Sequence, residues 1–315
     1  MKLSNSFVVL AAALSTASAF ALPLAPRDYA ENAKHLSAAL DGYNFDGIVA
    51  LNNCSGSLVR FQTSLADENA MVLTNGHCLA NAMGGGMPKP GVVIVDQAAN
   101  RTMNLLDPST GSKIGDVHAT KILYATMTGT DVTLYLLKET YAEIENGYKI
   151  HALTLANRYP AVGEGIDVIS GYWKRGYSCK VDGIVHELRE AGWSMKDSIR
   201  YSRPGCETIG GTSGSPIISL DTKEVVGVNN TGNENGEKCT MDNPCEVDER
   251  GTITYQKGLS YGQQISWFYS CLTDDRKIDL NKAGCLLAKP SSAPAPTPPR
   301  DEPKGSFWPK KSRLN

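Results

Sequence analysis

Beyond its first 21 residues the sequence has no long apolar run. A membrane-spanning helix needs about 18 or more consecutive apolar residues, and only the N-terminal segment FVVLAAALSTASAF approaches that length. This run follows Lys2, is short for a spanning helix, and carries small residues at Ala17 and Ala19, as cleaved secretory signals do. We therefore expect residues 1–21 to be a signal peptide, the mature protein to be secreted and extracellular, and a membrane not to be among its partners.

The sequence also lacks an excess of charge of either sign. Its 31 Lys and Arg residues against 33 Asp and Glu residues leave a formal net charge of -2. Nucleic acids and anionic lipid surfaces attract strongly basic proteins, so the composition argues against both as partners.

Metal ligands in recognisable patterns are missing as well. There are only five histidines, and no Cys and His residues cluster with the spacing of a zinc site. The segment CTMDNPCEVDERG is acidic, but it lacks the ligand spacing of a known calcium loop. The sequence therefore contains no recognisable metal-site pattern.

What is present begins with eight cysteines, an even number. In an exported protein such a set most economically forms four disulfides.

The ends of the chain differ from its middle. Residues 288–315 are rich in proline and poor in apolar residues, which predicts a disordered tail. Residues 22–44 carry a short helical pattern after a proline-rich start, which predicts a propeptide or an N-terminal arm. Residues 45–287 are then the expected folded domain.

Within that domain the texture is all-β. Eleven short runs rich in Val, Ile, Thr and Tyr alternate with Gly, Asn, Asp and Pro clusters: GIVALNN, SGSLVRF, AMVLTN, GVVIVDQ, KILYATM, DVTLYLL, GIDVISGYW, CKVDGIVHEL, SIRYS, SPIISL and EVVGVNN. This number indicates a barrel or sandwich and suits two separately closed sheets. One C-terminal helix is expected over residues 261–272, where apolar residues recur at spacings of three and four.

Three segments could carry chemistry. The glycine-rich stretch ETIGGTSGSPIIS is either an ordinary turn between strands or a turn that presents Ser213 as a nucleophile. His77 stands where the run AMVLTN ends, and Asp131 stands directly before an apolar strand. A nucleophilic serine needs a nearby base, and the base needs a third group that orients it. The other histidines have polar surroundings and are expected to be exposed or structural: His35, His118, His151 and His186.

In the order His77, Asp131, Ser213, the segments VLTNGHC, GTDVTLYLL and GGTSGSP resemble the three active-site segments of the chymotrypsin-like (trypsin-fold) serine peptidases. CSGSLV before the histidine and VVGVNN after the serine strengthen the resemblance, which covers about residues 45 to 272. It implies two antiparallel β-barrels with the active site between them, and we therefore expect no metal and no organic cofactor.

The resemblance also implies roles for individual residues. Ser213 would attack the scissile carbonyl, His77 would be the general base, and Asp131 would orient the imidazole. The backbone amides of Gly211 and Ser213 would form the oxyanion hole. The expected function is that of a monomeric, secreted serine endopeptidase acting on proteins or peptides; the alternative is a protease fold that has lost turnover and serves as a binding module.

The sequence departs from the family in two ways, one of which concerns the activation mechanism and the other the branch of the family. Thr212 stands where digestive members have an Asp that accepts a newly formed N-terminus, so we do not expect that switch, despite the Ile48-Val49 pair. The form GGTSGSP is similar to the bacterial glutamyl-endopeptidase-like branch. That branch reads a substrate carboxylate with a His, and Asn229 occupies the matching position here.

The sequence therefore leaves open whether the protein prefers substrates with basic or with acidic side chains. Glu207 lies six residues before Ser213, at the place that lines the base of the primary specificity pocket in trypsin-like relatives, next to Thr208. A carboxylate there would attract Lys or Arg. Alternatively, Glu207 faces solvent or pairs with a base such as Arg203. We take Glu207, Thr208 and Asn229 as the candidate substrate-binding residues.

The resemblance implies one disulfide, Cys54–Cys78, which would fix the loop that carries His77. The other six cysteines allow fifteen connectivities. Their proximity in sequence favours three pairs: Cys179–Cys206, Cys239–Cys245 and Cys271–Cys285.

Overall fold

In a computed structural model of the protein, residues 42–79 and 86–290 are described. They belong to one compact unit, residues 39–315, and the other unit, residues 1–38, lies outside the described residues. The expected signal peptide therefore falls outside them. So do His35, residues 22–41 of the expected propeptide or arm, and residues 291–315 of the expected tail.

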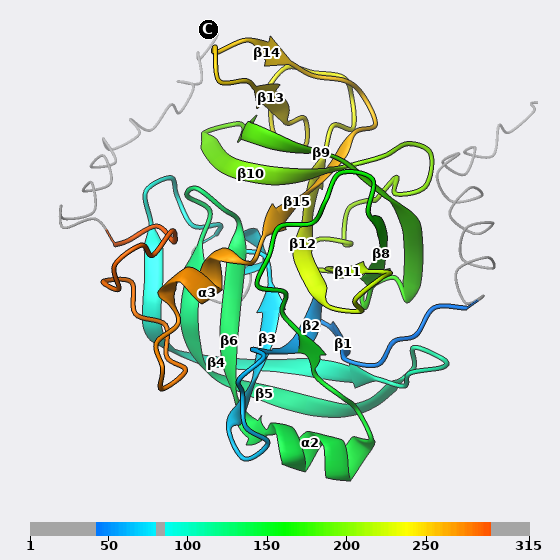
Figure 1. The fold of residues 1–315 in the computed structure, drawn as a ribbon. Helices are drawn as coiled ribbons and strands as arrows, with labels where there is room; N and C mark the ends of the chain where they lie inside the picture. Colours follow the sequence, from blue (N-terminus) through cyan, green and yellow to red (C-terminus); the bar gives the residue numbers. More distant parts are fainter. Residues whose placement is uncertain (1–41, 80–85, 291–315) are drawn as a thin grey trace, which may run out of the picture. The chain divides into compact units, whose positions relative to one another are not determined.

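The first sheet has seven strands, in the order β1-β4-β5-β6-β3-β2-β7 (Figure 1). β1 also pairs with β2, so six antiparallel strands form a closed ring of pairings. β7 joins this sheet in parallel, paired with Val59 and Arg60 at the end of β2, beyond the residues that pair with β1. The strands are β1 (Ile48–Ala50), β2 (Ser55–Arg60), β3 (Asn69–Thr74), β4 (Val93–Leu106), β5 (Lys113–Thr126), β6 (Val132–Thr140) and β7 (Leu153–Thr154).

The second sheet has eight strands, in the order β10-β15-β12-β11-β8-β9-β13-β14. An additional pairing of β10 with β9 closes six of them into a second ring. The strands are β8 (Gly165–Ser170), β9 (Arg175–Glu190), β10 (Trp193–Tyr201), β11 (Pro216–Ser219), β12 (Val225–Gly232), β13 (Cys245–Val247), β14 (Ile253–Thr254) and β15 (Ser260–Gln264).

The prediction of a mostly β protein with two sheets is confirmed, and each of the eleven predicted runs overlaps a strand. The helix predicted over residues 261–272 is largely wrong. Residues 260–264 form β15, which pairs with β12 and β10, and only α3 (Trp267–Cys271) is helical. The backbone bonds that β15 gains from two neighbouring strands outweigh its weak local helical pattern.

A second helix, α2 (Tyr141–Tyr148), follows β6 directly. Thr140 caps it, since the Thr140 hydroxyl accepts from the Glu143 amide and the Glu143 carboxylate accepts from the Thr140 amide. This is the capping-box pattern T-x-x-E, which the sequence carries at Thr140 and Glu143.

Apolar side chains of both sheets meet in a shared core. Val59 and Leu134 of the first sheet are fully buried in the same cluster as Val228 of the second. Tyr124 from β5 packs edge to face on Phe268 from α3, with 6.0 Å between ring centroids. Because this core extends across both sheets, loops from the two sheets meet at fixed positions.

All four predicted disulfides are present: Cys54–Cys78, Cys179–Cys206, Cys239–Cys245 and Cys271–Cys285. The first joins the start of β2 to the short 3₁₀ helix η1 (His77–Leu79), and the second joins β9 to the loop before Glu207.

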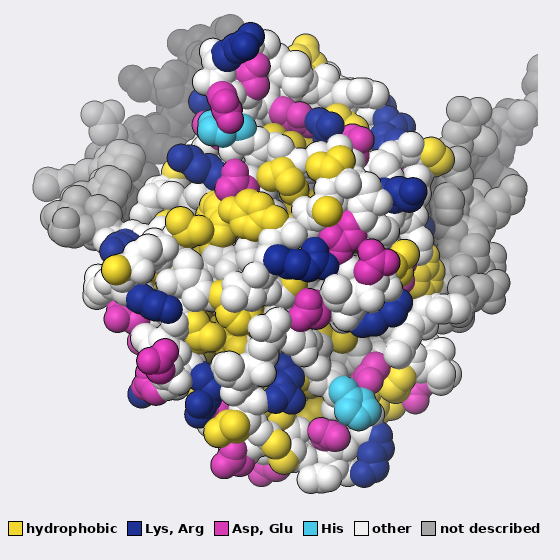
Figure 2. Space-filling view, viewed as in Figure 1, with side chains coloured by type: hydrophobic (Ala, Val, Ile, Leu, Met, Phe, Trp, Pro, Cys, Tyr) yellow, Lys and Arg dark blue, Asp and Glu magenta, His cyan; other side chains and the backbone are white. Residues whose placement is uncertain are grey.

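Figure 2 shows one face of the molecule, on which acidic and basic side chains are interspersed around a group of apolar ones. Within residues 42–79 and 86–290, no helix has the length and apolar character needed to cross a membrane.

Candidate active site

His77 is held next to Asp131 by two hydrogen bonds. The imidazole Nδ1 lies 2.8 Å from Oδ2 of Asp131, and the His77 backbone amide donates to Oδ1 at 3.0 Å. Asn75 donates to the Asp131 backbone carbonyl at 2.8 Å. A side chain at Gly76 would collide with the Thr126 carbonyl. The close approach of the loop before His77 to the end of β5 therefore requires glycine at position 76.

The electrostatic environment raises the pKa of His77 above its usual 6.5. Burial of the ring lowers this pKa, but the charge and the hydrogen bond of Asp131, which is only 2 % exposed, outweigh that effect. Glu190 and Asp242 contribute in the same direction. The raised pKa means that the surroundings stabilise the imidazolium that forms when His77 accepts a proton during a reaction.

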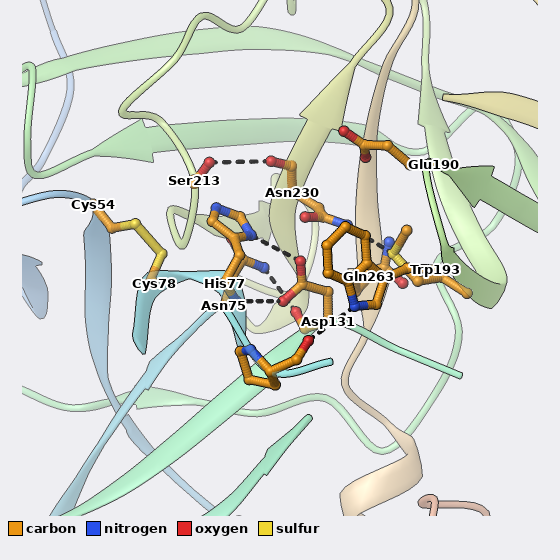
Figure 3. A network of polar contacts seen from close by, with 12 residues as sticks. Cys54, Asn75, His77, Cys78, Asp131, Glu190, Trp193, Ser213, Asn230 and Gln263 are labelled. Carbon is orange, nitrogen blue, oxygen red and sulfur yellow. Dashed lines mark hydrogen bonds and ion pairs between the residues drawn. A yellow bond between two sulfur atoms is a disulfide. The ribbon is translucent and has the colours of Figure 1, made fainter. Parts of the chain in front are cut away.

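Ser213 lies on the other side of the imidazole from Asp131 (Figure 3). Its hydroxyl donates to the Asn230 backbone carbonyl at 3.1 Å. Among the described residues, no hydrogen bond joins Ser213 to His77. The serine is therefore next to the imidazole with its hydroxyl turned toward β12.

The turn before Ser213 contains a backbone conformation that favours glycine, as the glycine-rich stretch ETIGGTSGSPIIS suggested. Gly211 has a φ of +89°, where a residue with a side chain would be strained. Within the described parts of the chain, neither the Gly211 amide nor the Ser213 amide donates a hydrogen bond. Thr212 is buried and its hydroxyl donates to the Ile209 carbonyl, which keeps the turn closed on itself.

Thr212 also bears on activation. Ile48 and Val49 are fully buried and lie within β1, paired with β2. Both residues are thus paired inside a strand, and neither acts as a free N-terminus at Thr212.

His77, Asp131 and Ser213 line one cleft, and all three expected substrate-binding residues, Glu207, Thr208 and Asn229, line it too. The acidic side chains along the cleft are Asp131, Glu190, Glu207, Glu234 and Asp242. No lysine or arginine lines it among the described residues, and His77 is its one basic side chain there.

The expected substrate-binding residues differ in their surroundings. Glu207 is exposed and accepts a hydrogen bond from the Gly205 amide at 2.9 Å. Arg203 donates instead to the Lys257 carbonyl, so the pairing considered for Glu207 is not formed. Asn229 is 1 % exposed and donates to the Thr212 hydroxyl at 3.3 Å, while its Oδ1 has no partner among the described residues.

The sequence analysis missed Glu190 and Trp193 as cleft residues. They stand at the tip of the β9–β10 hairpin, which the Gly129–Met195 bridge holds against the loop before Asp131. Burial raises the pKa of Glu190 to about 7. Its carboxyl accepts from the Asp242 amide at 2.8 Å. No local pattern in the sequence marks these residues, because a long-range pairing brings them to the cleft.

One group among the described residues has the proximity of metal ligands: Cys54, His77 and Cys78, whose ligand atoms lie within 4.8 Å of one another. The two sulfurs form a disulfide with each other, so they are not thiolates and do not fit a metal site. The acidic segment after Cys239 also has a structural use, since Asp248 accepts from the Arg250 and Thr252 amides.

Two β-sheets that share a cleft with a His–Asp pair beside a serine are features of a peptidase domain. A family model described as "Trypsin-like peptidase domain" matches residues 54–228, more than half of the chain. The chain therefore belongs to the trypsin-like peptidase family.

Several solved structures are similar to the chain at low identity. The MamO protease domain from Magnetospirillum magneticum is 13% identical, with a TM-score of 0.46 over 74% of this chain and 99% of that one. A protease from M. tuberculosis in its active form is 15% identical, with a TM-score of 0.44 over 90% and 97%. Neuropsin from mouse brain is 15% identical, with a TM-score of 0.41 over 71% and 91%. No curated protein matches the chain.

Proposed function

We propose that the protein is a secreted serine endopeptidase that hydrolyses peptide bonds with Ser213, His77 and Asp131. The observation that carries this proposal is the direct pairing of His77 with Asp131, 2.8 Å apart, in the same cleft as Ser213. The glutamyl-endopeptidase-like form of GGTSGSP is compatible with this chemistry, whichever branch the chain belongs to.

In the proposed reaction, the Ser213 hydroxyl leaves the Asn230 carbonyl and attacks the scissile carbonyl. His77 takes the hydroxyl proton and passes it to the leaving amine, which leaves Ser213 acylated. Water then attacks the ester with His77 again acting as base, and Ser213 is regenerated. Asp131 keeps the imidazole in the tautomer whose free nitrogen faces Ser213 and stabilises the cation that forms.

The oxyanion of the tetrahedral intermediate would bind to the backbone amides of Gly211 and Ser213. Their lack of partners among the described residues leaves both N–H groups available for this role. Removing one such donor in comparable enzymes raises the barrier by about 3 to 4 kcal/mol.

Lys or Arg is the proposed preference at the residue before the scissile bond. Glu207 is one of five acidic side chains along the cleft, and no described lysine or arginine there would neutralise them. Negative charge in a confined cleft favours the binding of cationic substrate side chains. The alternative, a preference for Glu or Asp, is disfavoured by the same charges and by Asn229, which offers no positive charge.

We further propose that residues 45–287 are the peptidase domain and that each ring of strand pairings is a closed barrel, with α3 as the C-terminal helix. Phe45 and Leu287 are buried, at 0 % and 4 % exposed, which supports these boundaries. Four disulfides support an oxidising, extracellular location for a protein that works as a monomer.

The test is cleavage of a mixed peptide library by the mature protein and two variants. Ser213→Ala should lower kcat by on the order of 10⁶-fold. Ser215→Ala is the matched control, because Ser215 is fully buried, its hydroxyl has no described partner, and it does not line the cleft. A wild-type protein that binds peptides without cleaving them would support the binding-module alternative instead.

A further inference from the structure

Three carbonyl groups of the turn before Ser213 are held from outside the turn. The Trp173 indole N–H donates to the Gly210 carbonyl at 2.7 Å. The Ser55 hydroxyl donates to the Gly211 carbonyl at 3.2 Å, and the Ser55 amide donates to the Ser213 carbonyl at 2.8 Å. The backbone orientation of the turn is thus set by β2 and by the loop after β8.

The bond from Trp173 fixes the peptide that joins Gly210 to Gly211. In a trans peptide the carbonyl and the N–H lie in one plane and point in opposite directions. Trp173 does not line the cleft, whereas Gly210, Thr212 and Ser213 do. Because the Gly210 carbonyl points toward Trp173, the Gly211 N–H points away from the indole.

Local sterics alone do not select this orientation. A glycine pair can adopt positive or negative φ at little cost, and a Cβ built on Gly210 would meet nothing within 4 Å. The same peptide could thus rotate to point its carbonyl into the cleft, which would remove one donor. An external hydrogen bond is what distinguishes the two orientations.

Trp173 is itself firmly placed. Its backbone amide donates to the Ser170 hydroxyl at 3.1 Å, and that hydroxyl lies 2.9 Å from the Ser55 hydroxyl. Ser170 and Ser55 are both fully buried. A Cβ on Gly211 would lie 2.8 Å from the indole nitrogen, so the ring contacts the turn directly.

We propose that Trp173 is a positioning residue for the oxyanion hole: its indole N–H holds the Gly210 carbonyl and so directs the Gly211 amide toward the substrate carbonyl. This rests on the proposed peptidase function, because the hole has a use only if Ser213 is acylated. Trp173 does not contact the substrate in this proposal.

The test compares Trp173→Phe with wild type. Phenylalanine keeps an aromatic ring and lacks the N–H donor. The probe is p-nitrophenyl acetate, whose acylation of Ser213 does not depend on peptide specificity. The acylation rate constant should fall about 3- to 10-fold, the range that one ordinary hydrogen bond produces. The midpoint of the pH–rate profile should stay unchanged, since the His77–Asp131 pair is untouched, whereas general damage to the site would shift it.

The matched control is Trp267→Phe, since the Trp267 indole also donates a hydrogen bond, to the Tyr159 hydroxyl, outside the cleft. This variant should acylate at the wild-type rate. Wild-type acylation by Trp173→Phe would overturn the proposal, and so would an equal loss in both variants.

A crystal structure of Trp173→Phe separates this inference from the proposed function. If wild type is not acylated at all, the peptidase function fails, and the oxyanion-hole role fails with it. If wild type is acylated, the Gly210–Gly211 peptide in the variant decides the positioning role: a rotated peptide supports it, and an unchanged peptide overturns it.

Discussion

Asp131 holds His77 at two points, through Oδ2 to the ring nitrogen at 2.8 Å and through Oδ1 to the backbone amide at 3.0 Å. Asp46 holds His151 in the same two-point manner, with both distances at 2.8 Å. The two pairs differ in their surroundings. Asp131 is 2 % exposed and lines the cleft with Ser213, whereas the His151 side chain is 62% exposed and lies outside the cleft.

The two pairs provide a matched test of the role of Asp131. Asp131→Asn should lower kcat by about 10⁴-fold, because an amide at this position favours the wrong imidazole tautomer. Asp46→Asn makes the same chemical change at the exposed pair and should leave kcat unchanged. Steady-state kinetics of both variants measures the difference, and comparable losses would show that Asp131 has no special function.

Activity should depend on the protonation of His77. A general base must be neutral, so kcat/KM should rise with pH through the pKa of His77, which lies above 6.5. Since the charge of Glu190 raises this pKa, Glu190→Gln should move the midpoint to lower pH.

Glu139→Gln is the control for that shift, because Glu139 pairs with His118 away from the cleft. The measurement is kcat/KM from pH 5 to 9 for wild type and both variants. A flat wild-type profile with chemistry rate-limiting would exclude His77 as the base.

Glu190 should also affect stability. Its pKa is raised from 4.5 to about 7 by burial, so the folded state holds a proton that the unfolded state releases between these pH values. Stability contributed by the protonated carboxyl is therefore lost as pH rises from about 4.5 to 7, by on the order of 3 kcal/mol. Urea unfolding at pH 5 and pH 7.5 should show this loss in wild type and much less of it in Glu190→Gln. Equal pH dependence in the two proteins would contradict the assignment.

Substrate preference tests Glu207. Glu207→Gln removes one negative charge from the cleft and should lower kcat/KM for Lys and Arg substrates several-fold, with little effect on uncharged ones. Glu249→Gln is the control, because Glu249 is exposed and does not line the cleft. Library profiling that finds no preference for basic residues in wild type would dismiss the proposed role of Glu207.

The strands were predictable because half-buried strands leave a pattern of β-branched and aromatic residues between turn residues. The strand at residues 260–264 was not predictable, because it depends on backbone pairing with β12 and β10. The local spacing of its apolar residues is that of a helix. α2 was predictable in principle from Thr140 and Glu143, the two residues of its capping box.

The candidate site likewise contains residues that the sequence could predict and residues that it could not. His77, Asp131 and Ser213 carry local motifs, and the cleft brings them together. Glu190 and Trp173 carry none. Glu190 reaches the cleft because the Gly129–Met195 bridge holds the β9–β10 hairpin against the loop before Asp131, and Trp173 reaches the Gly210 carbonyl across a separation of 37 residues. Such placements depend on tertiary structure and leave no local signal.

Covalent labelling of Ser213 tests the central claim most directly. A sulfonyl fluoride should modify the mature protein at one serine, found by mass spectrometry in the peptide that contains Ser213, and His77→Ala should abolish the labelling. An unmodified Ser213, under conditions where a control serine peptidase is fully labelled, would contradict the account.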